Sequence, residues 1–137
     1  ECNTMINLIT GKRGSGKTKV LVEQIIEAAN TATGAVVCIE RGMKLTYDIP
    51  HKVRLVDAEG YGINSFDAFY GFVTGMLAGN YDIQQVFVDG ILKMGGRDYE
   101  ALGAMLEKLA IVAKDIKIVF TVSEDAENLP AKVKAFM

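Results

Sequence analysis

The stretch LITGKRGSGKTKV, residues 8–20, joins an apolar run to a glycine-rich turn that ends in Lys17 and Thr18. The turn fits the pattern G-x-x-x-x-G-K-[ST] without a mismatch. Glycines let the backbone curl tightly, so that successive N–H groups point inward without interference from Cβ atoms. The segment that follows has helical periodicity and would add the free N–H groups and positive dipole end of a helix. The stretch therefore predicts a strand, a phosphate-binding turn and a helix, in that order.

This turn predicts a site for a nucleoside triphosphate with Mg²⁺. Lys17 is expected to reach the β- and γ-phosphates, and the Thr18 hydroxyl is expected to bind the metal. A Gly-rich turn that matches by chance is the alternative, but the flanking strand and helix are the context that the motif requires. The predicted nucleotide-binding residues are Gly11, Lys12, Arg13, Gly14, Ser15, Gly16, Lys17, Thr18 and Lys19.

Composition predicts one domain over residues 1–137, because 50% of the residues are hydrophobic and no repeat or linker divides the chain. A net charge of −2 argues against a protein that coats nucleic acid through a strongly basic surface. The longest apolar-rich stretch, residues 63–79, is interrupted by polar residues, so no membrane span is expected. The N-terminus shows no secretory signal pattern, which favours a cytoplasmic protein.

The cysteine and histidine content argues against a zinc site. Cys2 and Cys38 form no CxxC pair and His51 is the only histidine, whereas zinc needs three or four such ligands. Cys38 lies in an apolar run and is expected to be buried.

Predicted strands alternate with predicted helices along the chain. Ser65 is a candidate N-cap for a helix whose apolar side chains share one side, which predicts core packing rather than base stacking. The alternation predicts an α/β fold, a three-layer α/β/α sandwich with a mainly parallel sheet. The strands are expected at residues 5–10, 35–40, 53–57, 85–90 and 116–123, and the helices at 17–29, 66–77, 99–114 and near the C-terminus.

Three polar residues, Glu40, Asp89 and Ser123, end predicted strands at the edge where parallel sheets bind ligands. Asp89 closes the run VFVD and is expected on a strand next to that of the glycine-rich turn. There its carboxylate would hold Mg²⁺, usually through water. The alternative for Asp89 is a simple turn-forming role.

Together these motifs resemble the P-loop NTPases, and within them the RecA-like ATPases, a group that includes PilT-type motors. The resemblance covers most of the chain and rests on GKRGSGKT (11–18), GAVVCIE (34–40), VDAEGYGINSFDAF (56–69) and YDIQQVFVDG (81–90). It implies ATP as the ligand and Asp89 as the Walker B aspartate. It also implies that Lys17 and Glu40 are the catalytic residues, with Glu40 polarising the attacking water. Thr121 and Ser123 would sense the γ-phosphate.

The chain also departs from the family pattern. Gly90 follows Asp89, so the adjacent glutamate of many motor ATPases is missing. The extra strands and DNA-binding loops of a recombinase, and the N-terminal domain and His-containing motif of PilT-type motors, are not found. We therefore apply the resemblance only to the nucleotide-binding core, and not to recombination or pilus retraction. Glu40, followed by Arg41, is either the general base or part of an exposed turn with a local ion pair.

Arg13, Arg41 and Arg97 are candidate arginine fingers. Arg97 follows two glycines and would reach a neighbouring subunit's nucleotide, contact phosphate within its own chain, or be solvated. Because RecA-like ATPases often form rings, a homo-oligomer or a protein partner is compatible with the resemblance.

The expected function is ATP binding with Mg-dependent hydrolysis. The alternatives are a non-hydrolysing nucleotide-binding regulatory module, which the missing second acid favours, and a small-molecule or nucleoside kinase. A kinase of the thymidine-kinase type is disfavoured, since no zinc-binding lasso cysteines or Arg-rich lid are present. DAEG, residues 57–60, matches the DxxG of GTPases, but no N-K-x-D sequence follows, so a loop is predicted there and ATP is preferred over GTP.

Overall fold

A computed structural model describes residues 5–137, which form an α/β fold with a five-stranded, all-parallel sheet. The predicted α/β class and parallel sheet are confirmed. The strands are β1 (Ile6–Thr10), β2 (Ala35–Glu40), β3 (Arg54–Asp57), β4 (Ile83–Asp89) and β5 (Lys117–Val122). The helices are α1 (Lys17–Thr31), α2 (Phe66–Gly79), α3 (Ile91–Gly95), α4 (Tyr99–Val112) and α5 (Ala131–Lys134), with a short 3₁₀ helix η1 (Ala126–Asn128).

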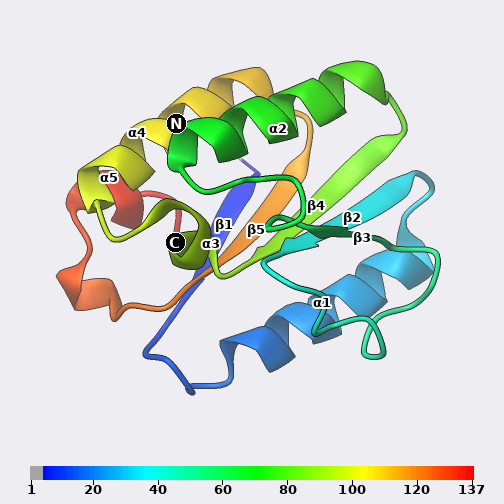
Figure 1. The fold of residues 1–137 in the computed structure, drawn as a ribbon, viewed down its shortest axis with the longest axis horizontal. Helices are drawn as coiled ribbons and strands as arrows, with labels where there is room; N and C mark the ends of the chain where they lie inside the picture. Colours follow the sequence, from blue (N-terminus) through cyan, green and yellow to red (C-terminus); the bar gives the residue numbers. More distant parts are fainter. Residues whose placement is uncertain (1–4) are drawn as a thin grey trace.

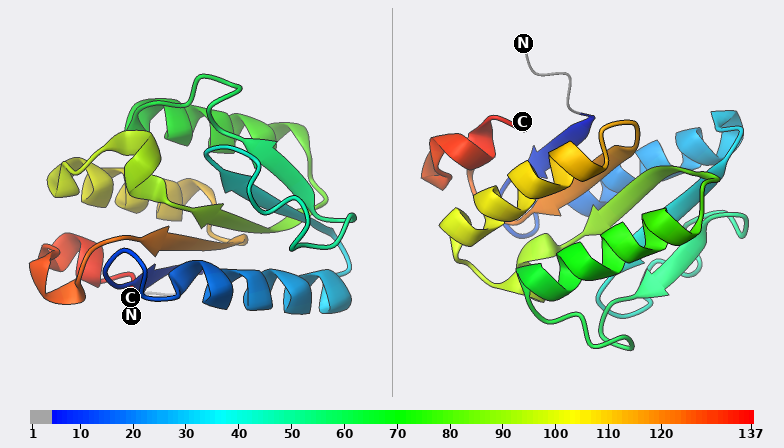
Figure 2. Two further views of the ribbon diagram at one scale, coloured as in Figure 1. Left: turned by 60° about the horizontal axis from the view of Figure 1, so that its bottom comes forward. Right: turned by 90° about the horizontal axis from the view of Figure 1, so that it is seen from above.

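Helices cover both faces of the sheet, an arrangement compatible with a three-layer sandwich. Figure 1 shows α1 on one face and α2 with α4 on the other, and the two views of Figure 2 agree. Strand β2 is buried along nearly its whole length, as expected for a continuous apolar strand with helices on both faces. Because all five strands are parallel, their carboxyl ends meet at one edge of the sheet.

The strand order is β1-β5-β4-β2-β3, which corrects one prediction. The strand of Asp89 was expected beside the strand of the glycine-rich turn, but β5 lies between β4 and β1. Pairing between strands far apart in the sequence is not encoded in either strand's local pattern. The insertion brings Thr121 of β5 beside Asp89.

Strand β1 lies at the edge of the sheet, and the end of the chain covers part of that edge. The Leu8 N–H donates to the Phe136 carbonyl oxygen at 3.1 Å. Phe136 itself is buried in the core cluster on the α4 side of the sheet. The segment after α5 is thereby fixed against β1.

The helix boundaries differ slightly from those predicted. Helix α1 extends two residues further and α4 ends two residues earlier. The predicted Ser65 cap of α2 is confirmed, since its Oγ accepts from the Ala68 N–H at 3.0 Å. The five-residue helix α3 was not predicted; it lies between Gly90 (φ 79°) and Gly96 (φ 91°).

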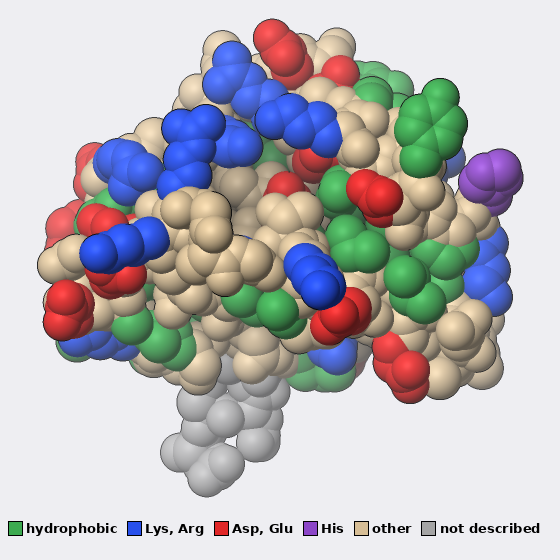
Figure 3. Space-filling view, turned by 90° about the horizontal axis from the view of Figure 1, so that it is seen from below, with side chains coloured by type: hydrophobic (Ala, Val, Ile, Leu, Met, Phe, Trp, Pro, Cys, Tyr) green, Lys and Arg blue, Asp and Glu red, His purple; other side chains and the backbone are tan. Residues whose placement is uncertain are grey.

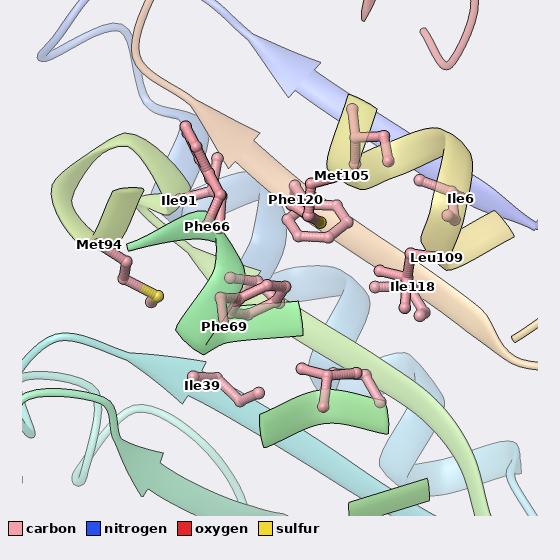
Figure 4. Packing of buried hydrophobic residues seen from close by; sticks show 14 of the residues in the cluster. Ile6, Ile39, Phe66, Phe69, Ile91, Met94, Met105, Leu109, Ile118 and Phe120 are labelled. Carbon is pink, nitrogen blue, oxygen red and sulfur yellow. The ribbon is translucent and has the colours of Figure 1, made fainter. Parts of the chain in front are cut away.

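The hydrophobic core has two parts, one on each face of the sheet. On the α2 and α4 side, Phe69 lies near Phe120 with ring centroids 5.7 Å apart, and Ile39 packs in the same cluster (Figure 4). The predicted packing role of the α2 apolar side is confirmed, because Phe66, Phe69 and Val73 are buried. On the α1 side, Cys38 is fully buried, as predicted.

The described helices do not include a membrane span. Within residues 5–137 every helix is too short or too polar to cross a lipid bilayer.

Replacing Phe69 with leucine should test the larger core cluster. The side chain is 0% exposed, so we expect Phe69→Leu to lower the free energy of unfolding by about 1–3 kcal/mol through lost burial and a small cavity. Tyr47→Leu is the control, because Tyr47 is 97% exposed and its loss should cost no more than about 0.5 kcal/mol. Urea denaturation measures both; equal losses would contradict this assignment of the core.

Candidate functional site

The glycine-rich turn joins β1 to α1 and adopts backbone angles that glycine tolerates best. Gly14 (φ 83°) and Gly16 (φ 91°) have positive φ values, and both are exposed. A Cβ on Gly11 would lie 2.6 Å from the Ser15 Oγ. Gly16 is the N-cap of α1 and offers no side chain to its first N–H groups, so these donors are available to a ligand.

Lys17, the first residue of α1, is folded back over the turn. It is 8% exposed, and its Nζ donates to the Lys12 carbonyl oxygen at 2.9 Å. Burial lowers the pKa of Lys17; the charge of Asp89 acts against this change and that of Lys93 adds to it. The ammonium group therefore lies within electrostatic reach of the Asp89 carboxylate.

Asp89 is held at the end of β4 by two hydroxyl groups. The Thr18 Oγ1 donates to its Oδ1 at 3.1 Å, and the Thr121 Oγ1 donates to the same atom at 2.8 Å. The Gly90 N–H in turn donates to the Thr121 Oγ1 at 2.7 Å. The two residues predicted to bind the metal, Thr18 and Asp89, are thus in direct contact across 71 positions of sequence.

A cavity of about 400 Å³ opens between the turn, the end of β4 and the loop before α4. Its volume falls in the range of small-molecule sites. Its ionisable side chains are four cations and one carboxylate, which favours an anionic ligand. Figure 3 shows Lys and Arg side chains gathered around a hollow on this face. The lining residues are Arg13, Gly14, Gly16, Lys17, Thr18, Asp89, Gly90, Leu92, Lys93, Arg97, Thr121 and Ser123.

The other predicted nucleotide-binding residues, Gly11, Lys12, Ser15 and Lys19, do not line this cavity. Lys12 is exposed and its Nζ lies 3.9 Å from the Asp125 Oδ2. Conversely, Leu92 and Lys93 line the cavity but were not predicted from the sequence. Gly90 and Gly96, which flank α3, are the local sequence feature that indicates a turn of the chain after Asp89.

The oxygen atoms near the turn suit Mg²⁺ bound together with a phosphate ligand. They do not form a metal site made of protein side chains alone. Within the described part of the chain, no group of three or more His, Cys, Asp or Glu side chains could hold a metal ion. Mg²⁺ is commonly bound by one or two carboxylates together with waters and substrate phosphates, and Thr18 and Asp89 supply a hydroxyl and one carboxylate. Cys2, considered for zinc, lies outside the described residues.

Glu40 is buried at the end of β2, and its carboxylate does not line the cavity. Its Oε2 accepts from the Leu45 N–H at 2.8 Å. The alternative that Glu40 lies in an exposed turn is wrong, because the residue is 2% exposed and Arg41 contacts Glu59 instead, at 4.0 Å. In the sheet, Glu40 pairs in register with Asp89. Its role as a general base stays a prediction.

The environment of Glu40 favours its neutral form. Burial raises the pKa of Glu40 above its ordinary value of 4.5, and the nearby charge of Asp89 acts in the same direction. The hydrogen bond from Leu45 acts against this rise.

In the DAEG segment, Asp57 ends β3 and residues 58–60 form a turn, so the predicted loop is confirmed only for the last three residues. The Asp57 Oδ1 accepts from the Gly42 N–H at 2.7 Å and from the Glu59 N–H at 3.0 Å. This carboxylate therefore joins the loop after β2 to the loop after β3. It does not line the cavity beside the glycine-rich turn.

Comparison of the chain with protein-family models finds no match, and comparison with curated proteins finds none either.

The buried carboxyl group of Glu40 predicts a pH-dependent stability. Because its pKa is raised on folding, its contribution to stability is fully present below pH 4.5 and is lost as the pH rises through the folded-state pKa. Glu40→Gln keeps an acceptor for Leu45 but carries no charge. We therefore expect the stability of Glu40→Gln relative to the unchanged protein to increase as the pH rises from about 4.5 to neutrality.

Urea denaturation across this pH range measures the difference. Glu59→Gln is the matched control, because the Glu59 side chain is 67% exposed. A difference between Glu40→Gln and the unchanged protein that does not vary with pH would contradict the prediction.

Proposed function

We propose that this protein binds ATP with Mg²⁺ in the cavity beside the glycine-rich turn and hydrolyses it, as a compact P-loop ATPase of the RecA-like type. One observation carries the proposal: Thr18 contacts Asp89 directly, beside the buried Lys17 and the free N-terminal end of α1. A lysine, a hydroxyl, a carboxylate and free amides are the groups that bind a triphosphate and its magnesium ion.

In this proposal the main-chain N–H groups of the turn and of the start of α1 bind the phosphate oxygens. Lys17 gives up the Lys12 carbonyl oxygen for the β- and γ-phosphates. Thr18 and Asp89 hold Mg²⁺, which when bound neutralises charge on the phosphates. The Asp89 carboxylate is already oriented for this task by the Thr121 hydroxyl.

Hydrolysis requires a group that orients and deprotonates the attacking water, and Glu40 is the proposed general base. A base must come within hydrogen-bonding reach of that water. Glu40 ends the strand next to β4, but its carboxylate is bound to the Leu45 N–H. Its Oε2 is occupied by this backbone donor, so its Oε1 is the atom that would have to reach the water when the nucleotide binds.

The second candidate function is a nucleotide-binding module that does not hydrolyse its ligand. The same Glu40–Leu45 hydrogen bond favours it, since the carboxylate is engaged away from the cavity. Gly90 also stands where a second acidic residue after Asp89 would help activate water. The two candidates share the binding site and differ in turnover.

Removing the Lys17 ammonium group should weaken nucleotide binding. We expect Lys17→Ala to reduce the affinity for Mg-ATP by about tenfold or more, because charge-assisted hydrogen bonds to phosphate are lost. Lys114→Ala removes an exposed lysine that does not line the cavity, and this variant should bind within about twofold of the unchanged protein. Calorimetric titration with Mg-ATP, Mg-GTP and their diphosphates measures this; no saturable binding to folded protein would end the proposal.

Glu40→Gln should separate binding from hydrolysis. We expect the variant to bind Mg-ATP like the unchanged protein but to release phosphate about 100-fold more slowly, a reduction typical of a lost general base. Phosphate release is measured under single-turnover conditions, with Lys17→Ala as the variant defective in binding. Normal turnover in Glu40→Gln would remove Glu40 from the mechanism, and tight binding without turnover in the unchanged protein would favour the regulatory module.

A further inference from the structure

Arg97, in the loop between α3 and α4, is fixed on the wall of the same cavity. Its Nη1 donates to the Tyr99 hydroxyl at 2.9 Å, and its Nη2 donates to the Ser123 carbonyl oxygen at 3.3 Å. The Tyr99 hydroxyl in turn donates to the Glu124 Oε2 at 3.0 Å. An exposed side chain on a loop after two glycines thus has a defined position.

The residues that hold Arg97 also contact the glycine-rich turn. The Gly11 N–H donates to the Glu124 carbonyl oxygen at 3.0 Å. Lys12 lies 3.9 Å from Asp125, the next residue. Residues 123–125 therefore contact the turn on one side and the α3–α4 loop on the other. They fix Arg97 relative to the turn of its own chain, without a neighbouring subunit.

The guanidinium group retains the capacity to bind an anion. Its two direct partners, a hydroxyl and a carbonyl oxygen, are uncharged, and the ion pairs found in residues 5–137 do not include Arg97. Two of its five N–H donors are used in these bonds, so others are available to a ligand. Its planar arrangement of donors matches phosphate oxygens better than an ammonium group does.

The position of Arg97 in the cavity indicates which phosphate it would contact. Asp89 and Thr18 are the residues that would hold Mg²⁺ with the triphosphate in the proposed complex. Thr121 contacts Asp89, and Ser123 follows two residues later and holds Arg97. Arg97 is thus connected through β5 to the Asp89 carboxylate, and in the proposed complex the terminal phosphate is assigned to it.

We propose that Arg97 binds the terminal phosphate of a nucleoside triphosphate held by the same chain, and thereby makes the site prefer triphosphates over diphosphates. This inference rests on the proposed nucleotide-binding function. Of the three roles that the sequence left open for Arg97, it selects the contact within one chain. Tyr99 and Ser123 are positioning residues in this account, because they hold the guanidinium group beside the cavity.

The test compares a triphosphate and a diphosphate on matched variants. Titrations with Mg-ATPγS and Mg-ADP use the unchanged protein, Arg97→Ala, Arg97→Lys and Arg54→Ala. Arg54 is the control, since it is an exposed arginine at the opposite end of the sheet and does not line this cavity. Far-UV circular dichroism and thermal unfolding verify that each variant is folded.

We expect Arg97→Ala to weaken Mg-ATPγS binding by about tenfold or more and Mg-ADP binding by less than about twofold. Arg97→Lys keeps the charge but not the planar donors, so its affinity for Mg-ATPγS should fall between those of the unchanged protein and Arg97→Ala. This variant remains informative if the alanine variant fails to fold. Arg54→Ala should bind both nucleotides as the unchanged protein does.

Several results would overturn the inference. Equal weakening of both nucleotides in Arg97→Ala, or no change in either, would show that Arg97 does not contact the terminal phosphate. A preference for Mg-ATPγS that disappears on dilution to a monomeric protein would show that the arginine acts between subunits. Failure of the unchanged protein to bind either nucleotide would defeat the proposed function as well, whereas the first three results leave it standing.

Discussion

The arrangement of the candidate site depends on the buried hydroxyl group of Thr121, a residue of β5 that is bonded to the end of the neighbouring strand β4. It accepts from the Gly90 N–H and donates to the Asp89 carboxylate, so both its acceptor and its donor functions are used. A buried hydroxyl without partners is costly, and this one joins β5 to the end of β4 at the point where the chain turns into α3. The orientation of Asp89 towards Thr18, and with it the shape of the cavity, follows from this pair of hydrogen bonds. A valine of similar shape would fill the space but would leave the Gly90 N–H unpaired.

The buried polar residues are concentrated at the carboxyl end of the sheet, next to which the cavity opens. Among residues 5–137 the buried polar or charged residues are Lys17, Glu40 and Thr121. Side chains alternate between the faces of a strand, so Glu40 shares the α1 face with Cys38, and Thr121 shares it with Val119. Burial of such groups opposes folding unless each has a partner, and each here has one. Perturbed pKa values at Lys17 and Glu40 fit a functional role for this end of the sheet.

Much of the fold could be predicted because its signals are local. The glycines of residues 11–18, the apolar run of β2 and the Ser65 cap of α2 each depend on residues close in sequence. Thr18 and Asp89 were predicted to bind one metal ion, and the structure brings their side chains into contact. The insertion of β5 between β1 and β4 could not be, because it is decided by packing among distant strands. The hydrogen bond from Leu45 to Glu40 likewise depends on the path of a loop, and no residue pattern specifies it.

The carbonyl oxygen of Phe136, bonded to Leu8, has a consequence for self-association. An outer strand of a sheet exposes unpaired backbone groups that can template the addition of a foreign strand. In this protein that outer strand leads directly into the glycine-rich turn, so an added strand there would also disturb the cavity. The Phe136 carbonyl oxygen, near the end of the described residues, occupies a backbone donor in the middle of this strand. The Leu8 N–H is therefore not available to an added strand beside the cavity.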